Sequence, residues 1–301
     1  MSETLTNTPL VSVVVITYNS SRYVLETLES IKSQTYKNIE LVISDDCSTD
    51  ETVAICQKWI GINQERFVRT EIVLVDKNTG VAPNCNRGLK AAQGEWIKLI
   101  AGDDLLYGDA IDAYVGFAKE NPKAEVIVSD MECFGEKNHR VSVNKSINDK
   151  SADWQLKKFL LLAKDGVPHT GPPWFHKRKV LEAIGGYDLS YPMIEDFPTV
   201  LRLLDNGVKV YALNHVCVGY RVVAGSLSTE KGFMEKFLNM YLASAFPVIK
   251  KRKLFLILYE FYVFRAITLK KNKIMNIKIF RYALRMTSPY SWVEYVRKRV
   301  T

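Results

Sequence analysis

The sequence has few cysteines, and they form no pattern that would crosslink a small fold or bind zinc. Its five cysteines are scattered, odd in number and never spaced as C-x-x-C, which argues against a disulfide framework and against a zinc site. The first ten residues lack a basic segment followed by an apolar stretch, so no secretory signal is visible. We therefore expect a protein that works in the reducing cytoplasm.

Several common catalytic and nucleotide-binding motifs are also missing. The chain has no G-x-G-x-x-G, no Walker A loop and no G-x-S-x-G, so the usual signals for dinucleotide binding, P-loop phosphate binding and α/β-hydrolase chemistry are missing. No internal repeat or low-complexity segment is apparent. An apolar content of 47% over 301 residues is enough to bury a substantial core and does not indicate disorder.

Acidic residues are scarce at the C-terminal end, where the basic residues gather. From residue 250 onward, fourteen Lys and Arg face two acids, a balance of +12 that leaves −4 of the total +8 for residues 1–249. The apolar run at 254–269 contains Glu260 and Arg265 and is shorter than the ~20 residues of a spanning helix. Two interpretations stay open: helices lying on an anionic membrane surface, and a helical cap on the preceding domain.

Strand and helix patterns alternate through the first hundred residues. Short, β-branched apolar runs predict strands at 10–16, 39–44, 71–76 and 96–101. Helical patterns lie at 23–33 and 83–92, and another helix is expected to begin near Asp50. This β-α order predicts a parallel sheet flanked by helices, in which ligands bind beyond the carboxyl ends of the strands.

The second half of the chain is less regular. We expect helices at 110–119, 154–163 and 195–206, and strands at 125–129, 209–213 and 216–222. The polar stretch 135–150 predicts a mobile loop, and the proline- and aromatic-rich stretch 169–175 is expected to be irregular. The alternating patterns predict an α/β fold class.

Polar clusters follow the predicted strands at one edge of the sheet. They are Thr17-Tyr18-Asn19, Asp45-Asp46, Asn78 and Asp103-Asp104. Hard divalent cations such as Mg²⁺ or Mn²⁺ bind one or two protein carboxylates together with substrate phosphates. The Asp103-Asp104 pair is therefore a candidate metal site that would stabilise a departing nucleotide diphosphate. The alternative is a Gly-Asp-Asp turn with a helix cap.

Other polar residues allow both a functional and a structural interpretation. Asp46 could accept a hydrogen bond from a base or ribose, or could start an Asx-type turn. Asp196 opens a predicted helix, where acids complement the dipole, but it could also be a general base for an acceptor hydroxyl. We expect His169 and His176 to be surface or packing residues. Trp174 and Phe175 either stack on a sugar ring or fill the core.

Nine segments occur in an order that carries a family resemblance across residues 10–225. They are VSVVVITYN (11–19), SIKSQTY (30–36), ELVISDDCSTDET (40–52), NTGVA (78–82), NRGLKAAQGEWI (86–97), GDD (102–104), GGYD (185–188), ED (195–196) and YRVVAGSLS (220–228). Each segment is weak alone, but the ordered series is highly specific. It resembles a family 2 glycosyltransferase with the GT-A fold.

The resemblance implies an architecture and an activity. The GT-A fold is Rossmann-like, with a mostly parallel central sheet flanked by helices, here with a C-terminal helical extension. The implied domain is 1–229, with a nucleotide-sugar-binding half at 1–104 and an acceptor-binding half at 105–229, followed by the basic extension 230–301. The implied reaction is inverting, metal-dependent transfer from a nucleotide-diphosphate donor, by family habit a UDP-sugar, in cell-surface polysaccharide synthesis. The acceptor would be a glycan or lipid-linked glycan, and the tail would suit peripheral contact with the inner face of the membrane.

The resemblance also assigns residues. Donor contacts are implied for Thr17, Tyr18, Asn19, Asp46, Asn78, Asp103 and Arg221. Asp104, together with Asp103, would hold the metal with the diphosphate, and Asp196 would be the catalytic base.

Three positions depart from the family pattern. Ala101 stands at the first position of D-x-D-D, and Cys85 stands where an arginine is often found. Cys47 replaces a usual glycine, and we expect a turn that does not require positive φ to tolerate it.

Rival interpretations stay open. The departures leave room for a non-catalytic nucleotide-sugar-binding module, and a nucleotidyltransferase would share the sheet and the metal but release pyrophosphate. A nucleic-acid-binding role for the basic tail leaves the acidic clusters unexplained, so nucleic acid is not an expected partner.

Overall fold

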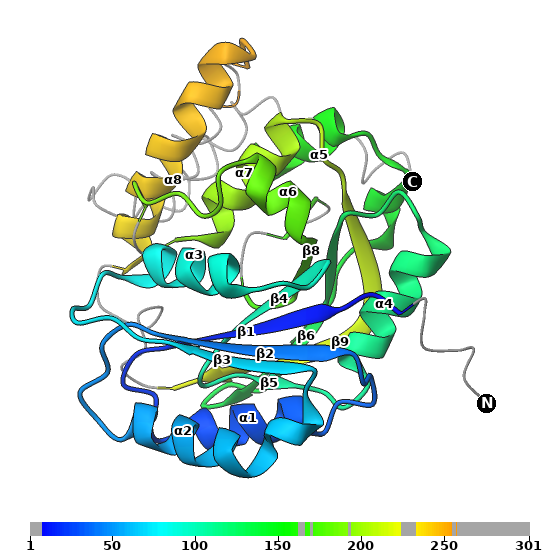
Figure 1. Cartoon of the computed structure of the whole chain (residues 1–301). Coiled ribbons are helices and arrows are strands. Elements are labelled where there is room, and N and C mark those ends of the chain that lie inside the picture. Colours follow the sequence, from blue (N-terminus) through cyan, green and yellow to red (C-terminus); the bar gives the residue numbers. More distant parts are fainter. Residues whose placement is uncertain are drawn as a thin grey trace.

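The computed structural model describes residues 8–161, 166–168, 171–191, 194–223, 233–254 and 257. Within them the chain forms a nine-stranded sheet of order β3-β2-β1-β4-β8-β6-β9-β5, with β7 paired to β6 (Figure 1). His169, residues 224–228 and most of the predicted C-terminal extension lie outside the described residues.

The first half follows the predicted alternation. Its elements are β1 (Val11–Thr17), α1 (Val24–Lys32), β2 (Ile39–Asp45), α2 (Thr52–Asn63), η1 (Gln64–Arg66), β3 (Arg69–Val73), α3 (Val81–Ala91) and β4 (Trp96–Ala101). Strands β3, β2, β1 and β4 are all parallel, as predicted. The third strand was expected at 71–76, but β3 spans Arg69–Val73. These are the residues that pair with β2.

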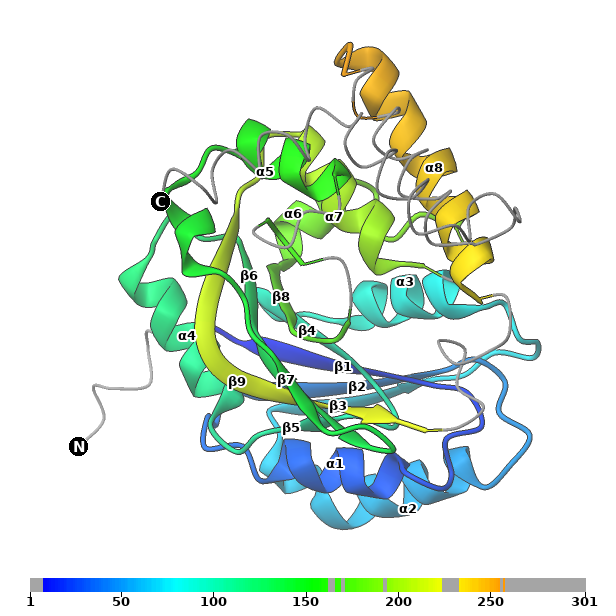
Figure 2. The same ribbon diagram turned by 180° about the vertical axis from the view of Figure 1, so that it is seen from behind.

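The second half departs further from the expectation. Its elements are β5 (Leu105–Leu106), α4 (Ala110–Glu120), β6 (Val126–Gly135), β7 (His139–Val141), η2 (Lys145–Asp149), α5 (Ala152–Leu160), β8 (Trp174–Lys177), α6 (Arg178–Ala183), α7 (Asp196–Asp205), β9 (Val210–Val222) and α8 (Phe233–Lys251). The polar stretch 135–150 contains β7 and η2 and is therefore not a single open loop. The two expected strands 209–213 and 216–222 are one long, curved strand, β9 (Figure 2). Its pairing with β6 shifts register near Asp130.

Trp174 and Phe175 were expected in an irregular stretch, and this prediction is wrong. They begin β8, which lies antiparallel between β4 and β6. Because both neighbours come from distant parts of the chain, the hydrogen bonds that make this segment a strand have no signature in its own sequence.

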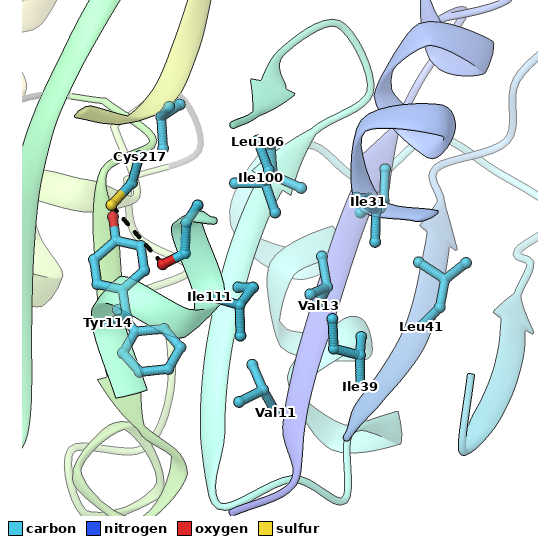
Figure 3. Close-up of a cluster of buried hydrophobic side chains, with 14 of the residues drawn as sticks. Val11, Val13, Ile31, Ile39, Leu41, Ile100, Leu106, Ile111, Tyr114 and Cys217 are labelled. Carbon is cyan, nitrogen blue, oxygen red and sulfur yellow. Dashed lines mark hydrogen bonds between the residues drawn. The ribbon is translucent and has the colours of Figure 1, made fainter. Parts of the chain in front are cut away.

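Residues of the buried parallel strands alternate between two apolar layers. Val11 and Val13 of β1 pack with Ile31 of α1 on one face, together with α2 and α4 (Figure 3). Val14 of β1 packs on the opposite face with Leu89 of α3. This placement explains the nearly continuous apolar run of β1, since a strand covered on both faces is apolar at most positions. The exception, Ser12, is buried and donates its hydroxyl to Glu40.

Helix α8 packs on α7 and on the end of α5 through its apolar side. The Tyr241 hydroxyl donates to the carbonyl of Leu160, and its ring lies 4.4 Å from that of Phe197 in α7. Among the described helices, none combines the length and the apolarity needed to cross a bilayer. The apolar run at 254–269, on which the membrane-surface hypothesis depends, lies almost wholly outside the described residues.

Candidate active site

The predicted strand-end clusters meet at one edge of the sheet. Thr17 at the end of β1 is in register with Asp45 at the end of β2, and Ile16 is in register with Ala101 at the end of β4. The end of β9 reaches the same place, because the Arg221 N–H donates to Asp104 Oδ1 at 2.9 Å. The structure thus brings residues from the first quarter and the last third of the chain into one site.

Thr17 and Asn19 bind the loops of the site to each other. The Thr17 hydroxyl and the Ser48 hydroxyl both donate to Asp45 Oδ2, at 2.7 and 2.6 Å. Asn19 donates its N–H to Ser48 Oγ and accepts from the Thr49 N–H with its side-chain oxygen, both at 2.8 Å. Next to this network the Tyr18 side chain is 50% exposed, so its ring is available to stack on a planar ligand.

Asp46 is held by the loop that follows β3. Its carboxylate accepts from the N–H groups of Thr79 and Gly80 and from the Thr79 hydroxyl, and Arg87 Nη2 donates to it at 2.6 Å. Burial opposes the charge, but these hydrogen bonds outweigh it and lower the pKa of Asp46. Asp46 therefore shapes the 78–80 loop, and its contact with a base stays a prediction. The exposed Asn78 accepts from the Gly80 N–H at 3.1 Å in the same loop.

Sequence reasoning missed Arg87. Its other terminal nitrogen donates to the Thr79 hydroxyl at 2.7 Å, so the guanidinium bridges the carboxylate and the loop. A role for Arg87 could have been inferred from Asp46, because a buried carboxylate requires a cation or several donors. Cys85, where the family often has arginine, is buried against Ala82 and Tyr187 instead.

The expectation for Cys47 is wrong. Its φ is 67°, in the left-handed region that favours glycine. The chain reverses here so that the Ser48 N–H reaches Asp45 Oδ1 at 2.8 Å. The turn therefore does require positive φ, and Cys47 adopts it at a cost. Asp50, near which a helix was expected to begin, lies one residue before Glu51, the N-cap of α2, and its carboxylate accepts from the Thr52 N–H at 3.0 Å.

Asp103 and Asp104 form an acid pair in which Asp104 is buried and Asp103 is partly buried. Asp104 is 2% exposed. Burial raises the pKa of both carboxyls, and the neighbouring charge of Asp103 raises that of Asp104 further, against the Arg221 N–H and the charge of Lys98. Gly102 permits the tight approach of this turn to β1, because a Cβ there would lie 2.8 Å from the Thr17 methyl group.

The acid pair fits a divalent cation. Two adjacent carboxylates with raised pKa values gain from a cation that neutralises both. Within the described residues, no group of three or more His, Cys, Asp and Glu side chains could hold a metal by itself. Mg²⁺ and Mn²⁺ suit such a site, because they bind one or two carboxylates and take their other ligands from phosphates and water.

Arg221 is fixed beside this pair. Its Nε donates to the Asp103 carbonyl at 2.8 Å and its Nη2 donates to Glu26 at 2.7 Å. The guanidinium lies between two rings, 4.3 Å from Tyr23 and 4.5 Å from Phe134. These contacts hold a cation next to the two acids, where it could also meet an anionic ligand.

Asp196 is the first residue of α7, as predicted, and is only partly exposed. Its Oδ2 accepts from the Gly171 N–H at 3.1 Å. Burial raises the pKa of Asp196, and the charge of Glu195 raises it further, against the Gly171 N–H and the charge of Lys98. A carboxylate with a raised pKa is a stronger base near neutral pH, so the surroundings suit the predicted role.

The aromatic segment of β8 fills the core. Phe175 stacks between Trp96 and Tyr114, with both centroid distances 4.7 Å. Trp174 is 4% exposed, and His176, also 4% exposed, stacks near it. Burial, and then the charge of Lys98, lowers the pKa of His176 to about 3. The prediction that His176 is a packing residue is confirmed, and the open choice for Trp174 and Phe175 is decided for the core.

Comparison with known proteins adds three findings. Residues 12–185 match the model of the family described as glycosyl transferase family 2. The UDP-Glc:alpha-D-GlcNAc-diphosphoundecaprenol beta-1,3-glucosyltransferase WfaP of Escherichia coli is 30% identical over 224 residues, covering 74% of this chain and 81% of WfaP. Two solved structures are similar in fold at lower identity.

The first of these structures is S. aureus TarS 1–349 in complex with UDP, 19% identical with a TM-score of 0.65, covering 97% of this chain and 82% of that one. This chain spans 46% of the longer S. aureus TarS chain. The second is the mannosyltransferase PcManGT of Pyrobaculum calidifontis in complex with GDP-Man and Mn²⁺, 19% identical with a TM-score of 0.56, covering 95% of this chain and 72% of that one. These likenesses confirm the GT-A fold expected from the sequence.

Proposed function

The chain belongs to glycosyl transferase family 2, and on that premise we propose that it transfers a sugar from a UDP-sugar to a hydroxyl of a lipid-linked glycan, with inversion, in cell-surface polysaccharide synthesis. The observation that carries the proposal is the meeting of the acid pair Asp103-Asp104 with the ends of β1, β2 and β9. The complex of TarS with UDP and the lipid-linked acceptor in the name of WfaP support the choice of donor and acceptor.

The donor would lie across the carboxyl ends of the strands. Tyr18 would offer its half-exposed ring to the base, and Thr17, Asn19, Asp46 and Asn78 would make the further donor contacts that the family resemblance implies. Asp103, Asp104 and Arg221 would face the ribose and the diphosphate. Mg²⁺ or Mn²⁺ would be held by Asp104 and Asp103, where it would neutralise the charge of the leaving diphosphate.

Asp196 would be the catalytic base. Its carboxylate takes the proton of the acceptor hydroxyl while the hydroxyl oxygen forms a bond to the anomeric carbon of the sugar. The bond from that carbon to the diphosphate oxygen breaks, the electron pair leaves with the nucleoside diphosphate, and the configuration inverts. Asp196→Asn should lower kcat by about 10²- to 10⁴-fold, the usual contribution of a general base, and should leave UDP affinity unchanged. Full turnover in this variant would refute the assignment.

Calorimetric titration with nucleoside diphosphates, with and without Mn²⁺, tests the donor site. We expect UDP to bind in the presence of Mn²⁺, and we expect Asp104→Ala to abolish that binding. Glu120→Ala is the matched control, because Glu120 is an exposed acid at the end of α4. Binding of a different nucleotide would redirect the donor assignment. If no nucleotide binds with metal present, the proposal fails in favour of a non-catalytic module.

The basic C-terminal segment would bring the enzyme to a membrane surface. Its +12 balance suits anionic headgroups, whereas the packing of α8 on α7 suits the alternative of a helical cap. Sedimentation of the full chain with anionic vesicles at physiological salt separates the two. Failure to bind the vesicles would favour the cap.

A further inference from the structure

Lys98 is a fully buried lysine that the proposed chemistry does not use. It lies in β4 and is 0% exposed. Strand β4 pairs with β8 only at Trp96 and Ile97, so Lys98 stands where the two strands separate. Its ammonium donates to the carbonyls of Leu99 at 3.2 Å and Trp174 at 3.3 Å, and also to the carbonyl of Pro172. The Lys98 ammonium therefore links β4 to the segment before β8 at the point where backbone pairing between the two strands has ended.

These bonds secure a segment that has few donors of its own. Pro172 and Pro173 have no N–H with which to pair this segment to a neighbouring strand, so the segment is held there through the bonds that its carbonyls accept. The Pro173 carbonyl accepts from the Ser129 N–H at 3.1 Å and from the Tyr114 hydroxyl at 2.7 Å. Lys98 donates to the carbonyls of the two residues that flank Pro173, namely Pro172 and Trp174. A buried cation holds its place at low cost only when its donors are satisfied in this way.

The same segment leads directly to the candidate base. Gly171 precedes Pro172, has φ +92°, and donates its N–H to Asp196 Oδ2 at 3.1 Å. A side chain at this position would be strained by that φ, and its Cβ would lie 3.3 Å from the Met131 sulfur. The position of the Gly171 amide therefore depends on how firmly the next residues are held.

We propose that Lys98 is a positioning residue, which fixes the 171–174 segment and, through the Gly171 amide, orients the carboxylate of Asp196. The proposal rests on the proposed function, because it takes Asp196 as the base. Lys98 also lies only a few residues before the Asp103-Asp104 turn. Its charge acts on both acidic parts of the site, because it opposes the raised pKa of Asp104 and of Asp196.

The charge of Lys98 supports this role. Burial lowers the pKa of Lys98 to about 8, against the opposing effects of Cys217, Asp104 and Asp196. Tyr114 of α4 and His176 of β8 also face it. A neutral amine has two N–H groups for three carbonyls. The wild-type enzyme should therefore lose kcat above about pH 8, as the segment loosens.

Lys98→Met tests the proposal, with Lys58→Met on the exposed face of α2 as the matched control. The readouts are Mn²⁺-dependent UDP affinity, kcat and KM for the hydrolysis of UDP-glucose and UDP-GlcNAc, and hydrogen exchange at the Gly171 amide. We expect kcat to fall by about 100-fold, the cost of misplacing a catalytic group by about 1 Å, while donor KM and UDP affinity change less than about threefold. The Gly171 amide should exchange faster, and the alkaline limb of kcat near pH 8 should disappear.

Three results would overturn the proposal. The first is a folded Lys98→Met variant with unchanged kcat, and the second is an equal loss of UDP affinity, which would indicate general damage to the site. If the variant does not fold, the wild-type kcat profile decides: the proposal requires an alkaline limb near pH 8 at constant UDP affinity, and a flat profile contradicts it. Failure of the proposed function is distinct, because it would appear as wild-type protein that cleaves no nucleotide-sugar at any pH.

Discussion

Replacing Cys47 with glycine should stabilise the protein. Cys47 has φ 67°, and the left-handed conformation costs a residue with a Cβ roughly 1–2 kcal/mol. Glycine avoids that cost but loses more backbone freedom on folding, about 0.5–1 kcal/mol. Because the Cys47 side chain is only partly buried, its removal gives up little apolar contact. The net expectation for Cys47→Gly is a gain of about 0.5–1 kcal/mol in the free energy of unfolding.

Thermal and urea unfolding measure this gain. A change of 1 kcal/mol shifts Tm by roughly 2–4 °C for 150–250 residues, so the variant should melt about 1–3 °C higher. Cys47→Ala is the matched control. It removes the thiol but keeps the Cβ, so it should show no gain.

Comparing the Tm shifts of Cys47→Gly and Cys47→Ala tests whether the gain comes from relief of backbone strain. An equal shift in both would assign the effect to the thiol, and no shift in Cys47→Gly would mean that the turn carries no strain. UDP affinity should change less than about twofold, below 0.5 kcal/mol, because Ser48 keeps its bonds to Asp45 in either case. A large loss of affinity would show that the thiol itself contacts the donor.

Removing other charges of the site should have opposite effects on stability. Burial and the charge of Asp103 raise the pKa of Asp104 in the folded protein. The stability that Asp104 contributes is therefore full below its pKa in the unfolded chain and is lost as the pH rises through its pKa in the folded protein. Asp104→Asn should raise Tm at pH 7 without metal, and a lower Tm would contradict this. The raised pKa of Asp196 should place the acid limb of kcat above the ordinary aspartate range, and a kcat that stays constant down to pH 4 would count against Asp196 as the base. Arg87→Met leaves Asp46 without its cation and should cost about 2–3 kcal/mol in urea unfolding, the worth of a charged hydrogen bond, while a neutral result would show that the Thr79 and Gly80 donors suffice.

Local patterns in the sequence were enough to predict the strands and helices of residues 1–104. The runs that became β1, β2 and β4 are mostly apolar because helices cover both faces of the sheet, and this burial is visible in the sequence itself. The polar clusters at Thr17 and Asp103-Asp104 followed from the rule that parallel strands place their carboxyl ends at one edge. That edge is where the structure brings them together.

The second half shows where such reasoning stops. Strand β8 directly follows two prolines, which led us to expect an irregular stretch, and the sequence does not show its pairing with β4 and β6. The left-handed φ of Cys47 was likewise missed, because the demand comes from the carboxylate of Asp45 and not from the residue type. For β8 the missing information lies in hydrogen bonds between distant strands, and for Cys47 it lies in the geometry of the local turn from Asp45 to Ser48.

The sequence by itself determined the family, the parallel strands of the first half and the residue types at their carboxyl ends, because the hydrophobic pattern and the order of elements along the chain are written in the sequence. Only the tertiary structure decided which charges neighbour which. Arg221 meets Glu26 across 195 positions, and Arg87 meets Asp46 across 41. Lys98, in a run of apolar residues, proved to be the donor for three carbonyls at the centre of the fold. Pairs of this kind form because a buried charge must find a partner, and the partner's place in the sequence is set by how the chain folds back on itself.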